Sequence, residues 1–177
     1  MRTMRKIAIS LTGVFVLAGC SSDPQGAATT LIEGELAEQI GLGPLRADCE
    51  VPENSEVGST FTCTATTDDG DRIELMTTFE PDDRIFVQTT NVLLADEVPR
   101  VEADAAASLG AETGVDLAPT AVQCPDGAVV LDAADQMRCR ITDPSDGTIY
   151  EMIVTMRDFD PDAGFQYVFY ELGDPIG

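Results

Sequence analysis

The chain lacks histidine altogether, and its single lysine is Lys6. Without histidine neither a Ser-His-Asp nor a Cys-His catalytic site can form, and without a lysine in the body of the chain there is no amine for a Schiff base. Gly-x-Ser-x-Gly and phosphate-loop motifs are also missing. We therefore expect no enzymatic activity. The alternative that survives these absences is a hydrolase using a carboxylate pair, and the 32 acidic residues offer too many pairs to choose one.

Positive charge is scarce as well. The chain has 10 Lys+Arg against 32 Asp+Glu, a formal net charge of −22. A chain this acidic is repelled by phosphate backbones and by anionic lipid surfaces, so we expect neither nucleic-acid binding nor peripheral electrostatic attachment to a membrane. The acidity serves solubility, or else it forms a surface that attracts cations or a basic partner.

Long apolar runs are absent except near the N-terminus. Arg2, Arg5 and Lys6 precede a mostly apolar stretch over residues 7–18, which is the layout of a secretory signal peptide. A membrane-spanning helix needs about 20 apolar residues, so this stretch is too short to remain as one. We predict that residues 1–19 are a signal peptide.

The apolar stretch ends in Leu17-Ala18-Gly19-Cys20, which resembles the lipobox of bacterial lipoproteins. The resemblance implies that the Cys20 sulfur receives a diacylglyceryl group, that the chain is cut between Gly19 and Cys20, and that Cys20 becomes the new N-terminus. Two or three acyl chains, palmitate among them, hold a protein stably on a membrane. The expected location is the extracytoplasmic face of the cell membrane. The plainer alternative is ordinary secretion, with Cys20 a stray thiol.

Residues 20–28 are short and polar and are predicted to form the lipidated tether. Thr30 and Glu33 then match a capping box, and apolar residues follow at helical spacing up to Ile40, with Gly41 or Gly43 ending the helix. From Leu45 the pattern becomes that of strands, over residues 45–51, 60–66, 72–79 and 85–92, with a turn at residues 68–70.

The second half repeats this plan. A helix is predicted over residues 99–109, ending near Gly110, and strands follow over residues 137–142, 148–157 and 165–172. Three landmarks recur at nearly constant spacing: Cys124 follows Cys49 by 75 residues, Cys139 follows Cys63 by 76, and Gly147 follows Gly70 by 77. We therefore predict an α+β fold of two tandem units, residues 29–95 and 96–177, each with one helix packed on an antiparallel meander of about four strands.

Cys20 is committed to lipid, which leaves four cysteines for disulfides in an oxidising compartment and allows three pairings. The repeat selects Cys49 with Cys63 and Cys124 with Cys139, because each unit then closes its own bond. Each loop of about 15 residues contributes roughly 3 kcal/mol in the chain-entropy model. Metal binding and other cofactors are not expected, since there is no Cys-x-x-Cys and no histidine.

The repeated pattern resembles a family of short domains of unknown function in actinobacterial envelope lipoproteins. In that family a helix is followed by Cys-Pro, a Gly before a second Cys, and Asp-Gly before an apolar strand. Cys124-Pro125, Cys139 and Asp146-Gly147 match this pattern, although Ala134 stands near the family's Gly. In the first half Gly58, Cys63 and Asp69-Gly70 match, but Glu50 follows Cys49 in place of Pro. The resemblance implies no activity.

Three further groups of residues offer alternatives. Asp158, Asp160 and Asp162 alternate before Gly164 like a calcium loop, yet the glycine comes one position late and Phe169 stands where a Glu is needed, so an acidic hairpin turn is the plainer interpretation.

Phe165, Tyr167 and Phe169 share a strand face opposite Tyr170. They form either the sheet face packed on a helix or a stacking surface for a ligand. Arg138 and Arg140 share a face and either clamp an anion or pair with acids of the chain.

These observations predict a membrane-anchored exported lipoprotein that acts as a non-catalytic binding or structural module of the cell envelope. Its expected partners are the membrane, through the lipid on Cys20, and an unknown envelope protein or glycan. The alternatives are an acidic Ca²⁺-binding surface and a carboxylate-based envelope hydrolase.

Overall fold

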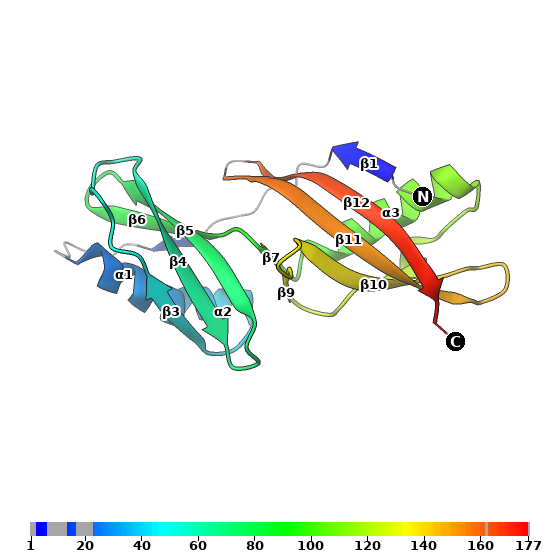
Figure 1. The fold of residues 1–177 in the computed structure, drawn as a ribbon, viewed down its shortest axis with the longest axis horizontal. Coiled ribbons are helices and arrows are strands. Elements are labelled where there is room, and N and C mark those ends of the chain that lie inside the picture. The colour runs from blue at the N-terminus through cyan, green and yellow to red at the C-terminus, as the bar shows by residue number, and fades with distance from the viewer. Residues whose placement is uncertain (1–2, 7–13, 17–22, 162, 177) are drawn as a thin grey trace. The chain divides into compact units, whose positions relative to one another are not determined.

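The computed structural model describes residues 3–6, 14–16, 23–161 and 163–176. The chain is mixed α+β with antiparallel sheets and two disulfides, and it separates into two compact units. One unit spans Thr12–Val92, and the other combines Met1–Leu11 with Leu93–Gly177. We call them the N-terminal and the C-terminal unit and describe each by itself (Figure 1). In the described part of the chain, every helix is too short or too polar to cross a bilayer.

The helix of the N-terminal unit starts earlier than predicted. It comprises α1 (Pro24–Leu31), a π-helical turn η1 (Ile32–Leu36) and α2 (Ala37–Ile40), and it ends at Gly41 in the left-handed conformation. The carboxylate of Asp23 caps it by accepting the backbone N–H of Gly26 at 2.9 Å, and Pro24 occupies the first turn, where its missing N–H costs nothing.

The predicted capping box at Thr30 and Glu33 is therefore wrong, because both residues lie inside the helix. The hydroxyl of Thr30 donates to the carbonyl of Gly26 at 2.9 Å, one turn back, and Glu33 accepts the backbone N–H of Ala47. Residues 24–28, predicted as part of the tether, belong to the helix. Asp23-Pro24 supplies a start signal of its own, an N-cap acid followed by a proline in the first turn, seven residues before Thr30, and the helix begins there.

The N-terminal sheet contains the four strands predicted between residues 45 and 92. Its order is β2 (Val14–Val16), β6 (Arg84–Thr89), β5 (Arg72–Glu80), β4 (Thr60–Thr67) and β3 (Leu45–Cys49), all antiparallel. Alternate residues of β4 and β5 are buried, which defines an inner and an outer face. The helix lies against the inner face (Figure 1), and the buried side chains of the two layers include Ala28, Ile32, Leu36, Phe61, Ala65, Ile73 and Leu75.

The helix of the C-terminal unit, α3 (Val98–Thr113), runs past its predicted end at Gly110 and terminates at Gly114, whose φ of 73° is left-handed. Gly110 lies inside the helix, and the chain that leaves the helix at Gly114 folds back against it: a Cβ on Gly110 would stand 2.8 Å from the carbonyl oxygen of Val115. A glycine within a helix can thus mark a close approach of backbone as well as a helix end.

The C-terminal sheet has the order β1 (Thr3–Lys6), β12 (Gly164–Pro175), β11 (Ile149–Asp160), β10 (Gln136–Thr142) and β8 (Val122–Gln123), again antiparallel. A short helix η2 (Pro119–Ala121) leads into β8, β9 (Val129–Val130) follows it, and β7 (Val92–Leu93) lies where the chain passes from one unit to the other. Strands β11 and β12 run 12 residues each, longer than predicted. Helix α3 lies along this sheet (Figure 1), over a core that includes Val101, Ala105, Leu109, Met152, Val154 and Tyr170.

Candidate functional site

Cys20, the predicted lipidation site, lies outside the described residues, as do Leu17, Ala18 and Gly19. The lipidation of Cys20 therefore stays a prediction. The functional groups available for description are the four other cysteines and the polar side chains around them.

Both predicted disulfides are present. Cys49 in β3 is bonded to Cys63 in β4, and the two are direct register partners with a Cα–Cα distance of 4.0 Å. Cys124, which follows β8, is bonded to Cys139 in β10 with a Cα–Cα distance of 4.2 Å. Facing residues of antiparallel strands come close enough for such a bond without backbone movement. The first bond joins neighbouring strands β3 and β4, and the second joins the residue directly after β8 to β10, the strand that pairs with β8.

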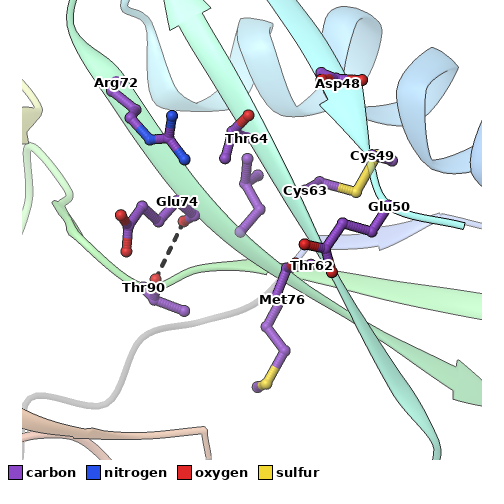
Figure 2. A pocket seen from close by; sticks show the side chains of 11 residues that line it. Asp48, Cys49, Glu50, Thr62, Cys63, Thr64, Arg72, Glu74, Met76 and Thr90 are labelled. Carbon is purple, nitrogen blue, oxygen red and sulfur yellow. Dashed lines mark hydrogen bonds between the residues drawn. A yellow bond between two sulfur atoms is a disulfide. The ribbon is translucent and has the colours of Figure 1, made fainter. Parts of the chain in front are cut away.

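A recess of about 670 Å³ lies beside the first disulfide, over the outer face of the N-terminal sheet (Figure 2). Thr62 and Thr64 of β4 and Glu74 and Met76 of β5 line it, because alternate residues of these strands point away from the helix. Charged residues complete the wall: Asp48, Glu50 and Arg72. The recess presents hydroxyl, carboxylate and guanidinium groups to solvent.

The end of this recess is held rigidly by the segment after β6. Asn91 accepts the backbone N–H of Glu74 at 2.8 Å and donates to the carbonyl of Arg72 at 2.9 Å. Thr90 donates its backbone N–H to the carbonyl of Glu74 at 2.9 Å, and its hydroxyl donates to the same oxygen at 3.3 Å, the bond drawn in Figure 2. The side chains of Arg72 and Glu74 thus extend from a fixed stretch of strand, an arrangement that favours binding a polar ligand without rearrangement.

A second recess, of about 460 Å³, lies beside the second disulfide in the C-terminal unit. Arg138, Arg140 and Glu151 line it with Pro125 and Asp126. Arg138 and Arg140 are exposed on the same face of β10, as predicted, and Arg138 forms an ion pair with Glu151 on the neighbouring strand. The interpretation in which the arginines pair with acids of the chain is therefore confirmed for Arg138. Arg140 has no ion-pair partner among the residues that the structure describes.

The acidic segment at residues 158–164 is the hairpin turn between β11 and β12. Asp160 is the register partner of Gly164, and its carboxylate accepts the backbone N–H of Ala163 at 2.9 Å. The side chain of Asp162 lies outside the described residues. Within the described part of the chain, no three of the acidic, cysteine and histidine side chains are grouped as a metal site would require. Calcium binding here stays a prediction without a described set of ligands.

The aromatic residues of β12 divide differently from the prediction. Tyr170 and Val168, on one face, are completely buried, whereas Tyr167 and Phe169 on the opposite face are half-buried. The hydroxyl of Tyr170 donates to the Asp104 carboxylate of α3 at 2.8 Å, so the residue predicted to face away is the one that reaches the helix. Phe165 is buried in the same core as Val168 and Tyr170, and its ring lies edge-on to that of Phe159, with ring centroids 5.4 Å apart. A period of two separates the faces of a strand but does not say which one is covered.

Glu97 carries a buried carboxylate that the sequence does not predict. Glu97, just before α3, is 2 % exposed, and its Oε2 accepts the backbone N–H of Leu94 at 2.9 Å. Burial raises the pKa of Glu97 above its ordinary value, a tendency that the hydrogen bond from Leu94 opposes. Nothing in the sequence distinguishes Glu97 from the many other acids, because its burial depends on the packing of the loop before α3.

No protein-family model, no curated protein and no solved structure matches this chain. The class of protein is therefore defined by its own fold: an α+β chain with antiparallel sheets, two intramolecular disulfides and a polar recess beside each of them. The resemblance to envelope lipoproteins stays a prediction.

Proposed function

We propose that the protein is an exported lipoprotein, anchored through acyl chains on Cys20 to the extracytoplasmic face of the cell membrane, where it acts as a non-catalytic binding or structural module of the envelope. The observation that carries the proposal is the pair of disulfides, Cys49–Cys63 and Cys124–Cys139. Disulfides persist in oxidising, exported environments and are rare in reducing ones. They therefore support the export that the N-terminal pattern predicts.

A binding role is supported by the outer faces of the sheets. In each unit the helix covers the inner face, and the outer face keeps a solvent-open recess lined by polar groups, with Glu74 and Arg72 in one and Arg140 in the other. Such groups recognise a polar ligand by hydrogen bonds and charge, which suits a glycan or a protein surface of the envelope.

We propose further that the two units arose as a tandem repeat. In both, a helix precedes a strand that ends at or next to a cysteine, and a disulfide joins that cysteine to the next long strand. If each unit depends on its own bond, Cys49→Ala with Cys63→Ala should destabilise the N-terminal unit by about 3 kcal/mol and leave hydrogen exchange in residues 98–172 unchanged. The matched pair Cys124→Ala with Cys139→Ala should do the reverse. Equal loss of protection in both halves would contradict the proposal.

The anchor is tested by intact mass and by cell fractionation. The wild-type chain should lack residues 1–19, carry acyl chains on Cys20, incorporate labelled palmitate and sediment with membranes. Cys20→Ser should lose the label and the acyl mass. A wild-type protein whose Cys20 is unmodified would refute the lipoprotein proposal.

The binding role is tested by co-sedimentation of the mature protein with purified envelope glycan and with membrane-protein fractions. Thr64→Trp places a large ring in the first recess, whereas Glu53→Trp adds the same ring at an exposed position outside it. We expect saturable binding that Thr64→Trp weakens roughly tenfold or more, about 1.4 kcal/mol, and that Glu53→Trp leaves unchanged. Binding insensitive to Thr64→Trp, and likewise to Arg140→Glu in the second recess, would contradict a role for these faces.

A further inference from the structure

The two edges of each sheet are covered in different ways, one by side chains of a helix and the other by a paired strand. In the N-terminal sheet β3 forms one edge and β6 lies at the other side, next to β2. In the C-terminal sheet β8 forms one edge and β12 lies at the other side, next to β1. An edge strand with free backbone N–H and C=O groups is a template for another strand, so what covers each edge decides whether the sheet can be extended.

The edges at β3 and β8 are covered by side chains of the unit's own helix. Glu33 accepts the backbone N–H of Ala47 at 2.9 Å, and Gln25 donates its side-chain amide to the carbonyl of Cys49 at 2.6 Å. In the C-terminal unit Glu102 of α3 accepts the backbone N–H of Cys124, directly after β8, at 2.8 Å. These backbone groups are no longer available to pair with another strand.

The opposite edges are covered by backbone from the N-terminal segment. Val14–Val16 pair antiparallel with residues 85–87 of β6. Thr3–Lys6 pair antiparallel with residues 167–170 of β12. Both pairings lie within residues 1–19, the segment that the proposed function removes on maturation. Cleavage before Cys20 would therefore take away β1 and β2 and turn β6 and β12 into edge strands.

Of the two strands, β12 would present the longer free edge after this cleavage. It runs 12 residues, and the part that pairs with β1 contains Tyr167, Phe169 and Tyr170, residue types that favour strands. A long edge of this kind recruits strands unless something covers it. The occupant present in the full chain, Thr3–Lys6, contains Arg5 and Lys6 and pairs through its main chain.

We infer that the mature lipoprotein uses the β12 edge to bind an extended, basic peptide strand of an envelope partner, which adds to the sheet in the position of Thr3–Lys6. This inference rests on the proposed cleavage. A basic strand is favoured over a second copy of the chain because the mature protein keeps seven arginines against 32 acids, a net charge of −25, and two such copies repel each other. Main-chain pairing supplies the affinity, and charge selects the partner.

The test measures amide hydrogen exchange at residues 167–170 in three samples: the full chain with Cys20→Ala, the mature protein in detergent, and the mature protein with a synthetic peptide of residues 1–8. We expect exchange roughly tenfold slower in the full chain than in the mature protein, and restored protection with the peptide. A peptide carrying Met4→Pro should not protect, since proline removes a strand N–H. The amide of Cys124, held by Glu102, is the internal control and should not respond.

Equal exchange in the full chain and the mature protein, or a peptide that leaves β12 unprotected, would overturn the inference. Protection that rises with protein concentration in the absence of peptide would also overturn it, because the occupant would then be a second copy. The intact mass of the mature protein separates this outcome from a failure of the proposed function. If Cys20 is unmodified, the lipoprotein proposal is refuted. Removal of residues 1–19 by a protease then still tests whether the freed β12 edge binds the peptide.

Discussion

Gly110 shows how one residue can limit a packing arrangement. It lies within α3, and a Cβ there would stand 2.8 Å from the carbonyl oxygen of Val115 and 3.6 Å from the backbone nitrogen of Leu117. The neighbouring atoms are backbone, which cannot rotate away as a side chain can. We expect Gly110→Ala to lower the free energy of unfolding by about 1–3 kcal/mol, despite the better helix propensity of alanine, as measured by urea denaturation.

Gly34 supplies the matched control. It also lies in a helical segment, the π-helical turn η1, but apart from its chain neighbours and the nearby backbone of its own helix, no atom of the described residues lies within 4 Å of the position that its Cβ would take. Gly34→Ala should therefore stabilise the protein by up to about 1 kcal/mol through propensity alone. The two glycine-to-alanine substitutions should thus change the free energy of unfolding in opposite directions. A similar loss of stability in both would contradict the role of the Val115 carbonyl.

Glu97 makes stability depend on pH. Its carboxyl is buried, and the causes that act on its pKa are burial, which raises it, the Leu94 backbone N–H, which lowers it, Asp96, which raises it, and Arg100, which lowers it. The net effect is a pKa above the ordinary 4.5. The folded state then binds the proton more tightly than the unfolded state does. Its contribution to stability is complete below the ordinary pKa and is lost as the pH rises through the raised value.

Glu97→Gln, which cannot ionise, should therefore be more stable than wild type at neutral pH and equal to it near pH 4. Urea denaturation at a series of pH values measures the difference between the two proteins. Asp96→Asn is the control, since it removes a charge from the adjacent position but leaves the buried carboxyl in place. If the stability gained by Glu97→Gln over wild type shrinks as the pH rises, folding does not raise the pKa of Glu97.

At the scale of elements, the contact between α3 and the C-terminal sheet includes one buried polar link. Tyr170 of β12 is fully buried, and its hydroxyl donates to Asp104 of α3 at 2.8 Å. A hydrogen bond to a charged acceptor contributes about 1.5–3 kcal/mol. Tyr170→Phe keeps the ring and removes this donor, so we expect a loss of that size in the free energy of unfolding.

Tyr150 of β11 is the comparison for Tyr170. It is half-buried in the same unit, and Tyr150→Phe should change stability by less than about 0.5 kcal/mol. Chemical denaturation of the two variants in parallel measures the difference. If both lose the same amount, the hydroxyl of Tyr170 stabilises the unit no more than that of the half-buried Tyr150 does.

Element boundaries show where sequence patterns are reliable and where they are not. Gly41, one of the two glycines predicted to end the first helix, does end it, because the left-handed cap is a local preference of glycine. The helix start was misplaced at Thr30 because two capping signals lie within seven residues of each other, and the apolar stripe continues through both. Which side chain caps the helix depends on where the chain meets the sheet, and that is not a local property.

At the scale of the whole molecule, charge repulsion outweighs ion pairing. Ion pairs join Arg46 to Asp68 and Arg138 to Glu151, but all four side chains are substantially exposed, and such pairs contribute about 0–1 kcal/mol each. The net charge of −22, which the proposed cleavage would bring to −25, acts against the compact state. We expect the melting temperature to rise when NaCl is increased from about 0.01 to 0.1 M, which shortens the Debye length from about 30 to 10 Å.

Differential scanning calorimetry of the mature protein measures this effect. Sodium sulfate at equal ionic strength is the comparison, because it adds a preferential-exclusion effect to the same screening. A melting temperature that falls with NaCl would mean that attractive pairs dominate the electrostatics, contrary to the exposure of the pairs described.

The sequence by itself determined the α+β class, the positions of the central strands and the pairing of the four cysteines. Strand alternation, turn residues and a repeated spacing are local or near-local properties, and they survive whatever the rest of the chain does. Only the tertiary structure decided that Tyr170 faces the helix, that Glu97 is buried, that Gly110 marks a close approach and that polar recesses flank the disulfides. These features depend on which surfaces meet and, for Gly110 and Glu97, on how the chain turns at a helix end, and no repeating pattern within one segment encodes either.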